Sequence, residues 1–123
     1  MLAVGVLAAF GVAAFPFVRA YFDGPQSLQA LQEGAKSPKR GYEIHHIVEQ
    51  ATANPDGSER ASIRGSDNLV RIPAVKHWEL NGWYETGNIN FGDMTPREYL
   101  KGKSWDERRR VGLKGLREVG VLQ

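Results

Sequence analysis

Two adjacent histidines, His45 and His46, lie in the short apolar run Tyr42–Gln50, and they are the residues best suited to chemistry in this chain. The third histidine, His77, follows later, with Asn68 between them. Neighbouring residues of an extended segment point to opposite sides, so one imidazole can face a metal ion while the other faces a substrate. Imidazole is a ligand of divalent metals and also a base that titrates near neutral pH. The pattern predicts a hydrolytic site built around one metal ion.

Three predicted elements position these residues. The β-branched and aromatic content of residues 42–48 favours a strand, and residues 69–72 alternate as a second short strand. Residues 74–84 are expected to form a helix, on which His77 and Asn81 are one turn apart and share a face. We therefore expect an α+β fold in which a strand, a second strand and a helix each supply part of one site.

This order of residues meets the needs of metal-assisted phosphodiester cleavage, which requires a base to activate water and a cation to neutralise the phosphate. His46 suits the base, and a carbonyl near Asn68 would accept the proton of its other ring nitrogen. His45 and His77 suit the metal as neutral imidazole ligands. Asn81 is the candidate for a third ligand, and an oxygen donor there would shift preference toward Mg²⁺ or Mn²⁺.

The sequence resembles the HNH, or ββα-metal, endonucleases, and is most similar to the HNH toxin modules at the C-termini of bacterial polymorphic toxins, including Rhs-type effectors. The segment His45–Gln50 reads His-His-Ile-Val-Glu-Gln, as in those modules. The stretch Asp67–His77 resembles the second half of the colicin-type DNase motif, with asparagine nine residues before histidine. The tail Thr95–Leu122 looks like the trailing helices of the toxin modules. The resemblance covers roughly residues 40–122.

The resemblance implies roles residue by residue. It assigns His45 and His77 to the metal, His46 to the general base, and Asn68 to orienting the base and bracing the loop. Asn81 departs from the colicin pattern, which has histidine at that place. The third ligand and the metal therefore stay open, with Mg²⁺ or Mn²⁺ favoured and Zn²⁺ or Ni²⁺ as the alternatives.

The resemblance further implies a monomeric endonuclease that cleaves DNA with little sequence preference, leaving 5′-phosphate and 3′-hydroxyl ends; RNA stays open as a substrate. We expect a toxin or effector delivered into the cytoplasm of a target cell, opposed by an acidic immunity protein. Three alternatives remain: a catalytically silent metal- or nucleic-acid-binding module, a prophage or restriction-type HNH nuclease, and a membrane-associated protein whose residues 1–22 are the functional part.

Other side chains near the motif have two interpretations each. Glu49 either supports the site through a hydrogen bond or ends the strand. Arg71 and Lys76 either bind phosphate or serve as surface cations. The run 108–110 is expected to form a salt-bridged helix face, and Trp78 is expected in the core because a small domain needs large apolar anchors.

Composition narrows the classes of protein. The chain of 123 residues is long enough for one domain with a modest core. It has no cysteine, which excludes disulfide scaffolds and Cys-His metal sites. Sixteen basic and fourteen acidic residues give a formal net charge of +2, which permits a nucleic-acid partner without establishing one.

We divide the chain into three parts. Residues 1–22 are hydrophobic, with Arg19 as the first charged residue, and form a membrane-inserting or translocating helix, a packed N-terminal helix or a cleaved signal. Residues 23–41 are a Pro/Gly-punctuated linker with one short helix. Residues 42–123 form the HNH domain, an α+β fold whose ββα-metal core is followed by trailing helices and preceded by the hydrophobic N-terminal helix.

Overall fold

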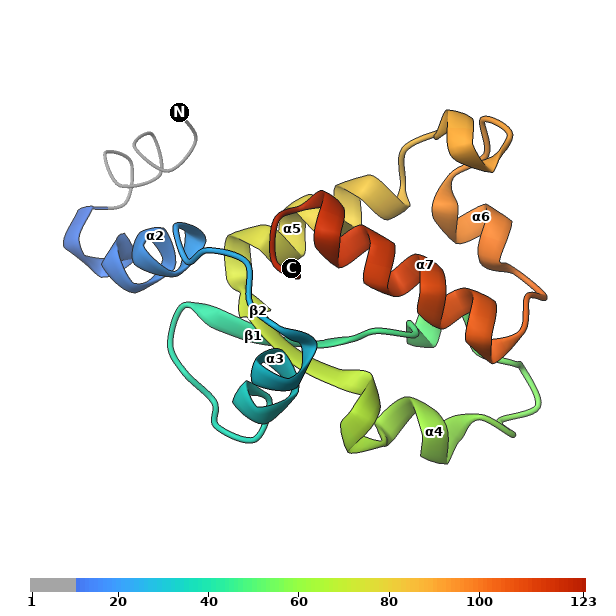
Figure 1. The fold of residues 1–123 in the computed structure, drawn as a ribbon, viewed down its shortest axis with the longest axis horizontal. Helices are drawn as coiled ribbons and strands as arrows, with labels where there is room; N and C mark the ends of the chain where they lie inside the picture. The colour runs from blue at the N-terminus through green and yellow to red at the C-terminus, as the bar shows by residue number, and fades with distance from the viewer. Residues whose placement is uncertain (1–10) are drawn as a thin grey trace.

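The computed structural model describes residues 11–123 and shows a small two-stranded antiparallel sheet surrounded by helices, an α+β arrangement (Figure 1). The elements in chain order are η1 Gly11–Ala14, α2 Phe15–Tyr21, α3 Leu28–Gly34, β1 Tyr42–His46, η2 Gln50–Thr52, α4 Arg60–Arg64, η3 Ser66–Asn68, β2 Leu69–Pro73, α5 Ala74–Tyr84, η4 Ile89–Phe91, α6 Pro96–Leu100 and α7 Trp105–Glu118. Both predicted strands and the predicted helix 74–84 are confirmed within the described residues.

The two strands pair so that the histidine strand has one buried and one open face. His45 is opposite Val70, and Ile44 is opposite Arg71. Cross-strand partners lie on the same face of a sheet. His45 and Val70 are buried, whereas Ile44 is 37% exposed. His45 therefore points toward the core, and its two neighbours in β1 point away from it.

The core forms where α7 crosses α5 and the segment that follows β1 (Figure 1). A Cβ atom at Gly112 would lie 2.2 Å from the carbonyl oxygen of Ile47, and one at Gly115 would lie 3.0 Å from Leu80. Gly112 lets α7 approach the backbone that leaves the histidine strand, and Gly115 lets it pack closely on α5, at a cost of about 1 kcal/mol each in helix propensity. The core side chains are Leu31, Ile47, Val70, Ile72, Leu80, Tyr84, Phe91, Leu100, Val111, Leu116, Val121 and Leu122.

Local signals fix the ends of the last two helices. The pattern Thr95-Pro96-Arg97-Glu98 predicts a capping box and the start of a helix. Thr95 and Glu98 form this reciprocal capping box at the start of α6, with Pro96 in the first turn. The Ser104 side chain accepts a hydrogen bond from the Glu107 amide and begins α7. Gly120, with φ +76°, follows the end of α7 and suits the left-handed conformation common there.

The described part of the hydrophobic segment is folded onto the domain. Helix α2 has seven residues and packs against α5, where the Tyr21 hydroxyl donates to Glu79 at 2.7 Å. Among residues 11–123, no helix is long and apolar enough to cross a membrane. The first ten residues of the predicted segment 1–22 lie outside the described residues.

The segment predicted as a linker, residues 23–41, contributes to the core. It contains the predicted short helix, α3, which Ser27 caps and which packs on β2. Leu31 of α3 is 3% exposed and belongs to the core cluster. Gln26 also forms a parallel bridge with Leu122, so the segment contacts the C-terminal end of the described chain.

Two sequence predictions outside the histidine motif are wrong. The turn signals at residues 54–57 and 65–67 predict a loop over residues 51–66, but this segment contains the five-residue helix α4, which buries Ile63. Trp78 was expected in the core, but it is 78% exposed because its position on α5 faces away from both the sheet and α7.

The salt bridges predicted for the run 108–110 are present at Arg108, which pairs with Glu59, and at Arg110, which pairs with Glu107. Arg108 is also 4% exposed and is hydrogen-bonded inside the fold.

Candidate functional site

The structure brings the three histidines to one open hollow beside the end of β1. The volume of the hollow is about 210 Å³, which is room for an ion and several water molecules. Its lining consists of Ile44, His45, His46, Glu49, Gln50, Ala51 and His77. Residues from a strand, the loop after it and a helix thus meet at one place, as the sequence predicts for the histidines.

His45 is in the state that a metal ligand requires. Its side chain is buried, its Nε2 atom has no hydrogen-bond partner within the described chain, and its ring centroid lies 5.2 Å from that of His77. Burial, and then positive charge on His77, His46 and Arg97, lowers the pKa of His45 to about 3. The imidazole is therefore neutral at neutral pH, with a lone pair free to bind a cation.

His77 is oriented by a carboxylate that the sequence analysis missed. The Nδ1 atom of His77, on α5, contacts Oε2 of Glu43 on β1. A metal-binding histidine commonly has its second ring nitrogen held by a carboxylate, which fixes the ring and its tautomer. With Nδ1 engaged, Nε2 of His77 is the nitrogen left to bind a ligand. Glu43 is two residues before His45 on the same face of the strand, and this spacing was the available signal.

His46 lies on the opposite face of β1 from His45 and is half-buried at the rim of the hollow. Partial burial, and then positive charge on His77, lowers the pKa of His46. A neutral imidazole that is accessible to solvent can take a proton from water. The two adjacent histidines therefore differ in exposure in the way that separate ligand and base roles require.

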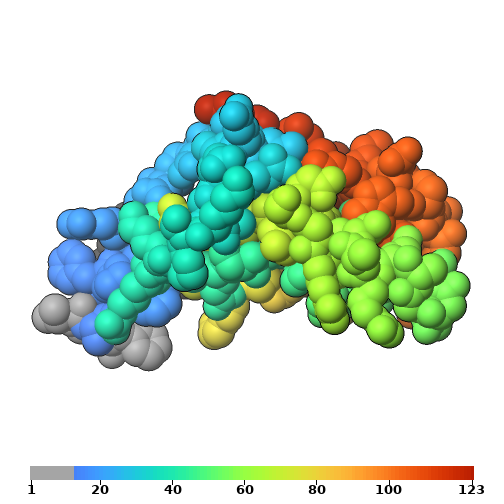
Figure 2. All heavy atoms as spheres, turned by 90° about the horizontal axis from the view of Figure 1, so that it is seen from below, coloured from blue at the N-terminus to red at the C-terminus, as the bar shows by residue number. Residues whose placement is uncertain are grey.

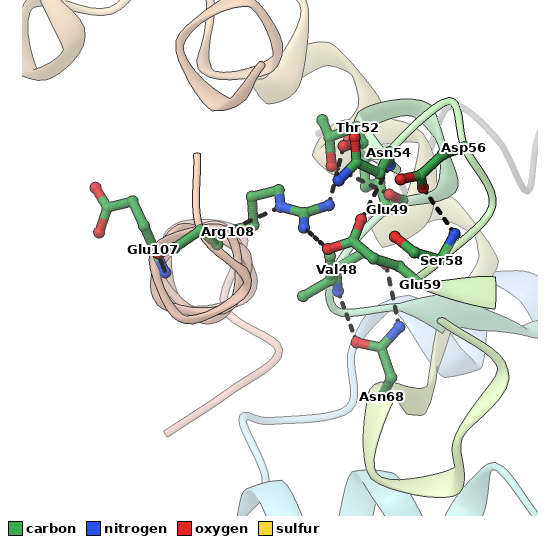
Figure 3. Close-up of polar contacts among 11 residues, drawn as sticks. Val48, Glu49, Thr52, Asn54, Asp56, Ser58, Glu59, Asn68, Glu107 and Arg108 are labelled. Carbon is green, nitrogen blue, oxygen red and sulfur yellow. Dashed lines mark hydrogen bonds and ion pairs between the residues drawn. The ribbon is translucent and has the colours of Figure 1, made fainter. Parts of the chain in front are cut away.

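Asn68 braces the loop that leaves the histidine strand. Its side chain is fully buried, Oδ1 accepts from the Val48 amide at 2.8 Å, and Nδ2 donates to the Val48 carbonyl at 3.1 Å (Figure 3). Nδ2 also donates to the Ile63 carbonyl at 3.0 Å. The backbone carbonyl of Asn68 accepts from the Ile47 amide at 2.8 Å. These hydrogen bonds engage both ends of the Asn68 amide group within the loop. None of them joins Asn68 to the His46 ring.

The same loop is held from α7 by a buried arginine. Arg108 donates to the carbonyl of Thr52 at 2.9 Å and pairs with Glu59 (Figure 3). The hydrogen bond from Arg108 lowers the pKa of Glu59, so this carboxylate is charged at neutral pH. Together with Asn68, Arg108 fixes the course of the chain between His46 and α4.

Arg97 is a further residue near the site that the sequence analysis missed. It donates from Nε and Nη2 to the two carboxylate oxygens of Glu49, at 3.1 and 2.7 Å, and it also contacts Glu85. Its guanidinium lies over the Tyr84 ring, 5.3 Å from the centroid. The capping box at Thr95 predicts the helix that carries Arg97, but no local pattern indicates the contact with Glu49. Glu49 thus lines the hollow in a fixed position.

The other candidates lie outside the hollow. Asn81 is exposed and is not among the lining residues, although it follows His77 by one helical turn. Arg71 donates to the Ser37 carbonyl at 2.6 Å. Lys76 lies 3.6 Å from a carboxylate oxygen of Glu79 and 4.6 Å from the centre of the Tyr21 ring. The structure does not bring these three side chains to the histidines.

The described side chains around the hollow provide fewer protein ligands than a complete metal site. Within residues 11–123, no group of three His, Cys, Asp or Glu side chains is arranged to hold a metal ion. Two imidazoles do converge, and one presents a buried nitrogen without a partner, an arrangement that costs free energy unless a ligand occupies it. His45 and His77 therefore fit a divalent cation whose remaining ligands are water and substrate oxygens.

Comparison with known proteins adds no relative to this picture. No protein-family model, no curated protein and no solved structure matches the chain.

Proposed function

We propose that this chain is a metal-dependent endonuclease of the HNH type that hydrolyses phosphodiester bonds of DNA with little sequence preference. The observation that carries the proposal is the unpartnered, buried Nε2 of His45 beside the His77 ring, with His46 at the rim of the same hollow. The element order β1, β2, α5 and the Glu43 contact to His77 support it further.

The residues have distinct tasks in this proposal. His45 and His77 would hold the cation, and Glu43 keeps the His77 ring in place. When bound, a divalent cation neutralises the scissile phosphate and stabilises the leaving oxygen. His46 takes a proton from the attacking water, and its lowered pKa keeps it in the basic form at neutral pH. Asn68 holds the loop after β1, which supplies part of the lining of the hollow.

The resemblance of His45–Gln50 to polymorphic toxin modules extends the proposal to the role of the protein. A bacterial toxin or effector module would require an immunity protein in the producing cell. A formal net charge of +2 favours an acidic partner, because opposite potentials accelerate association. Co-purification with an acidic protein that blocks cleavage would support this role.

Cleavage of supercoiled plasmid tests the activity. Wild type should nick and then linearise the plasmid with at least one of Mg²⁺, Mn²⁺, Ni²⁺ or Zn²⁺, and chelation should stop it. Ends that a ligase can rejoin would indicate 5′-phosphate and 3′-hydroxyl groups. Gln29→Ala, at an exposed position on α3, is the matched control and should cleave as wild type does. Equal, negligible cleavage by wild type and His46→Ala with all four ions would remove the enzyme proposal.

A parallel assay on single-stranded RNA decides between the nucleic acids, since the phosphate chemistry is shared. Binding of metal or DNA without any turnover would favour the catalytically silent module.

A further inference from the structure

A second hollow lies at the other end of the histidine strand, between α2 and the residues before β1. Its volume is about 470 Å³, and its lining includes Arg19, Lys39 and Arg40 with the aromatic rings of Phe15 and Tyr42. Figure 2 shows α2 and the connector side by side at one end of the molecule. We call this feature the cationic hollow.

The three cations of this hollow have no acidic partner. Within the described chain Arg19, Lys39 and Arg40 form no ion pair, and no carboxylate lines the hollow. The neighbouring cations Lys36 and Lys76 do have such partners, at 3.2 Å from Glu33 and 3.6 Å from Glu79. Three like charges from two separate segments repel one another, and an anion between them would relieve that repulsion.

Strand β1 connects the cationic hollow with the histidines. Tyr42, Ile44 and His46 alternate onto the same face of the strand, and this face is open, with Ile44 37% exposed. Tyr42 lines the cationic hollow, and His46 lines the histidine hollow. Four residues of strand span about 13 Å. A ligand that follows this face would thus touch the cations and the base together.

We propose that the cationic hollow binds the phosphodiester backbone of the nucleic acid whose scissile phosphate lies at His46. The inference rests on the proposed nuclease function and names the path of its substrate. Phosphates of one strand follow one another about every 3.4 Å along the axis of a duplex, so about 13 Å measured along that axis corresponds to roughly four nucleotides. Arg19 and Arg40 supply the charge, and the exposed edge of Phe15 suits sugar and base surfaces without reading sequence.

This path also gives α2 a task in the nuclease. The helix brings Arg19 to the same hollow as Lys39 and Arg40, and a backbone contact between α2 and Gly41 keeps them together. A Cβ atom at Gly41 would lie 2.4 Å from the Pro16 carbonyl oxygen, so the two segments pack closely only with glycine there.

The test compares two charge-neutralising double variants of the full chain. Arg19→Gln/Arg40→Gln removes two cations of the hollow, and Lys101→Gln/Lys103→Gln removes two exposed cations between α6 and α7. Binding to a short fluorescent duplex is measured without divalent metal over a range of salt concentrations. We expect the slope of log K against log salt to become shallower by about 2 for the first variant. Its affinity should fall about tenfold, and the control should change little. Arg19→Lys/Arg40→Lys should keep the wild-type slope.

Equal slopes for the two glutamine variants would overturn the inference. Binding of the wild type to phosphatidylserine vesicles but not to DNA would overturn it as well, because it would identify a lipid surface as the partner. The outcome is separable from that of the nuclease proposal. Plasmid cleavage with an unchanged slope would contradict the cationic hollow alone, whereas a changed slope without cleavage would contradict the nuclease and retain the hollow as a DNA contact.

Discussion

The rings of His45 and His77 lie 5.2 Å apart, centroid to centroid, although one residue belongs to a strand and the other to a helix. The strand buries His45 against the helix, and no hydrogen bond satisfies its Nε2 atom within the described chain. A buried polar atom without a partner is unfavourable, and a shared cation would satisfy both rings.

Removing His77 should therefore weaken metal binding. We expect His77→Ala to lower the affinity for Mn²⁺ or Ni²⁺ by more than the roughly 10–100-fold that loss of an outer contact costs. Titration calorimetry measures the metal affinity of the variant and of wild type. Asn81→Ala is the control variant. Because Asn81 is exposed and lies outside the hollow, the metal affinity of this variant should stay within a few fold of wild type. Unchanged affinity in His77→Ala would exclude His77 as a ligand.

Glu43 should act on the metal through His77. Glu43→Gln keeps the size of the side chain but removes the charge that holds the imidazole, so metal affinity should fall about 10–100-fold while the fold is retained. Glu33→Gln, on the exposed face of α3, is the control and should bind metal as wild type does. If both variants bind metal equally well, Glu43 does not position His77.

The stability of the metal-free protein should decrease on mild acidification. The pKa of His45 in the folded chain is about 3, whereas the ordinary value is 6.5. Between these values the unfolded chain binds the proton that the folded chain refuses, so stability is full above pH 6.5 and falls as pH falls toward 3. The slope is at most about 1.4 kcal/mol per pH unit for one group.

Urea unfolding between about pH 6.5 and pH 5 measures this slope, because carboxylates with lowered pKa titrate below that range. His46, whose pKa is also lowered, adds to the slope in the same direction. His45→Asn should have a flatter profile than wild type. Identical profiles for the two proteins would show that His45 is not buried in its neutral form.

Arg108 should contribute far more to stability than its neighbour Arg109. Arg108→Ala leaves Glu59 and the Thr52 carbonyl without their partner, and the free energy of unfolding should fall by about 3 kcal/mol. Arg109→Ala removes one exposed hydrogen bond to the Asp67 carbonyl and should cost about 1 kcal/mol or less. Chemical denaturation compares them, and similar losses in both variants would contradict the buried role of Arg108.

The elements that carry the histidines could be predicted because each has a local cause. Pro73 limits the second strand, and the Thr95 capping box begins α6. Such signals depend on neighbours in the chain.

Contacts between distant segments could not be predicted in the same way. Arg97 and Glu49 meet only after the helices pack, and nothing in either local sequence indicates the partner. The spacing of Glu43 and His45 places Glu43 on the face of the site, but only the packed fold shows that it contacts His77. The run 108–110 illustrates the limit: three identical side chains occupy different faces of α7, and only the packed fold shows that Arg108 is the buried one. Trp78 is the reverse case, an apolar residue that the orientation of α5 leaves exposed.

The most direct test of the central claim measures metal binding and DNA cleavage on the same His46→Ala preparation. If His45 and His77 hold the cation and His46 activates water, metal affinity should stay within a few fold of wild type while plasmid cleavage falls by about 100-fold or more. Cleavage at the wild-type rate by His46→Ala would contradict the assignment of the base. Loss of metal binding in that variant would contradict the separation of the two adjacent histidines into ligand and base.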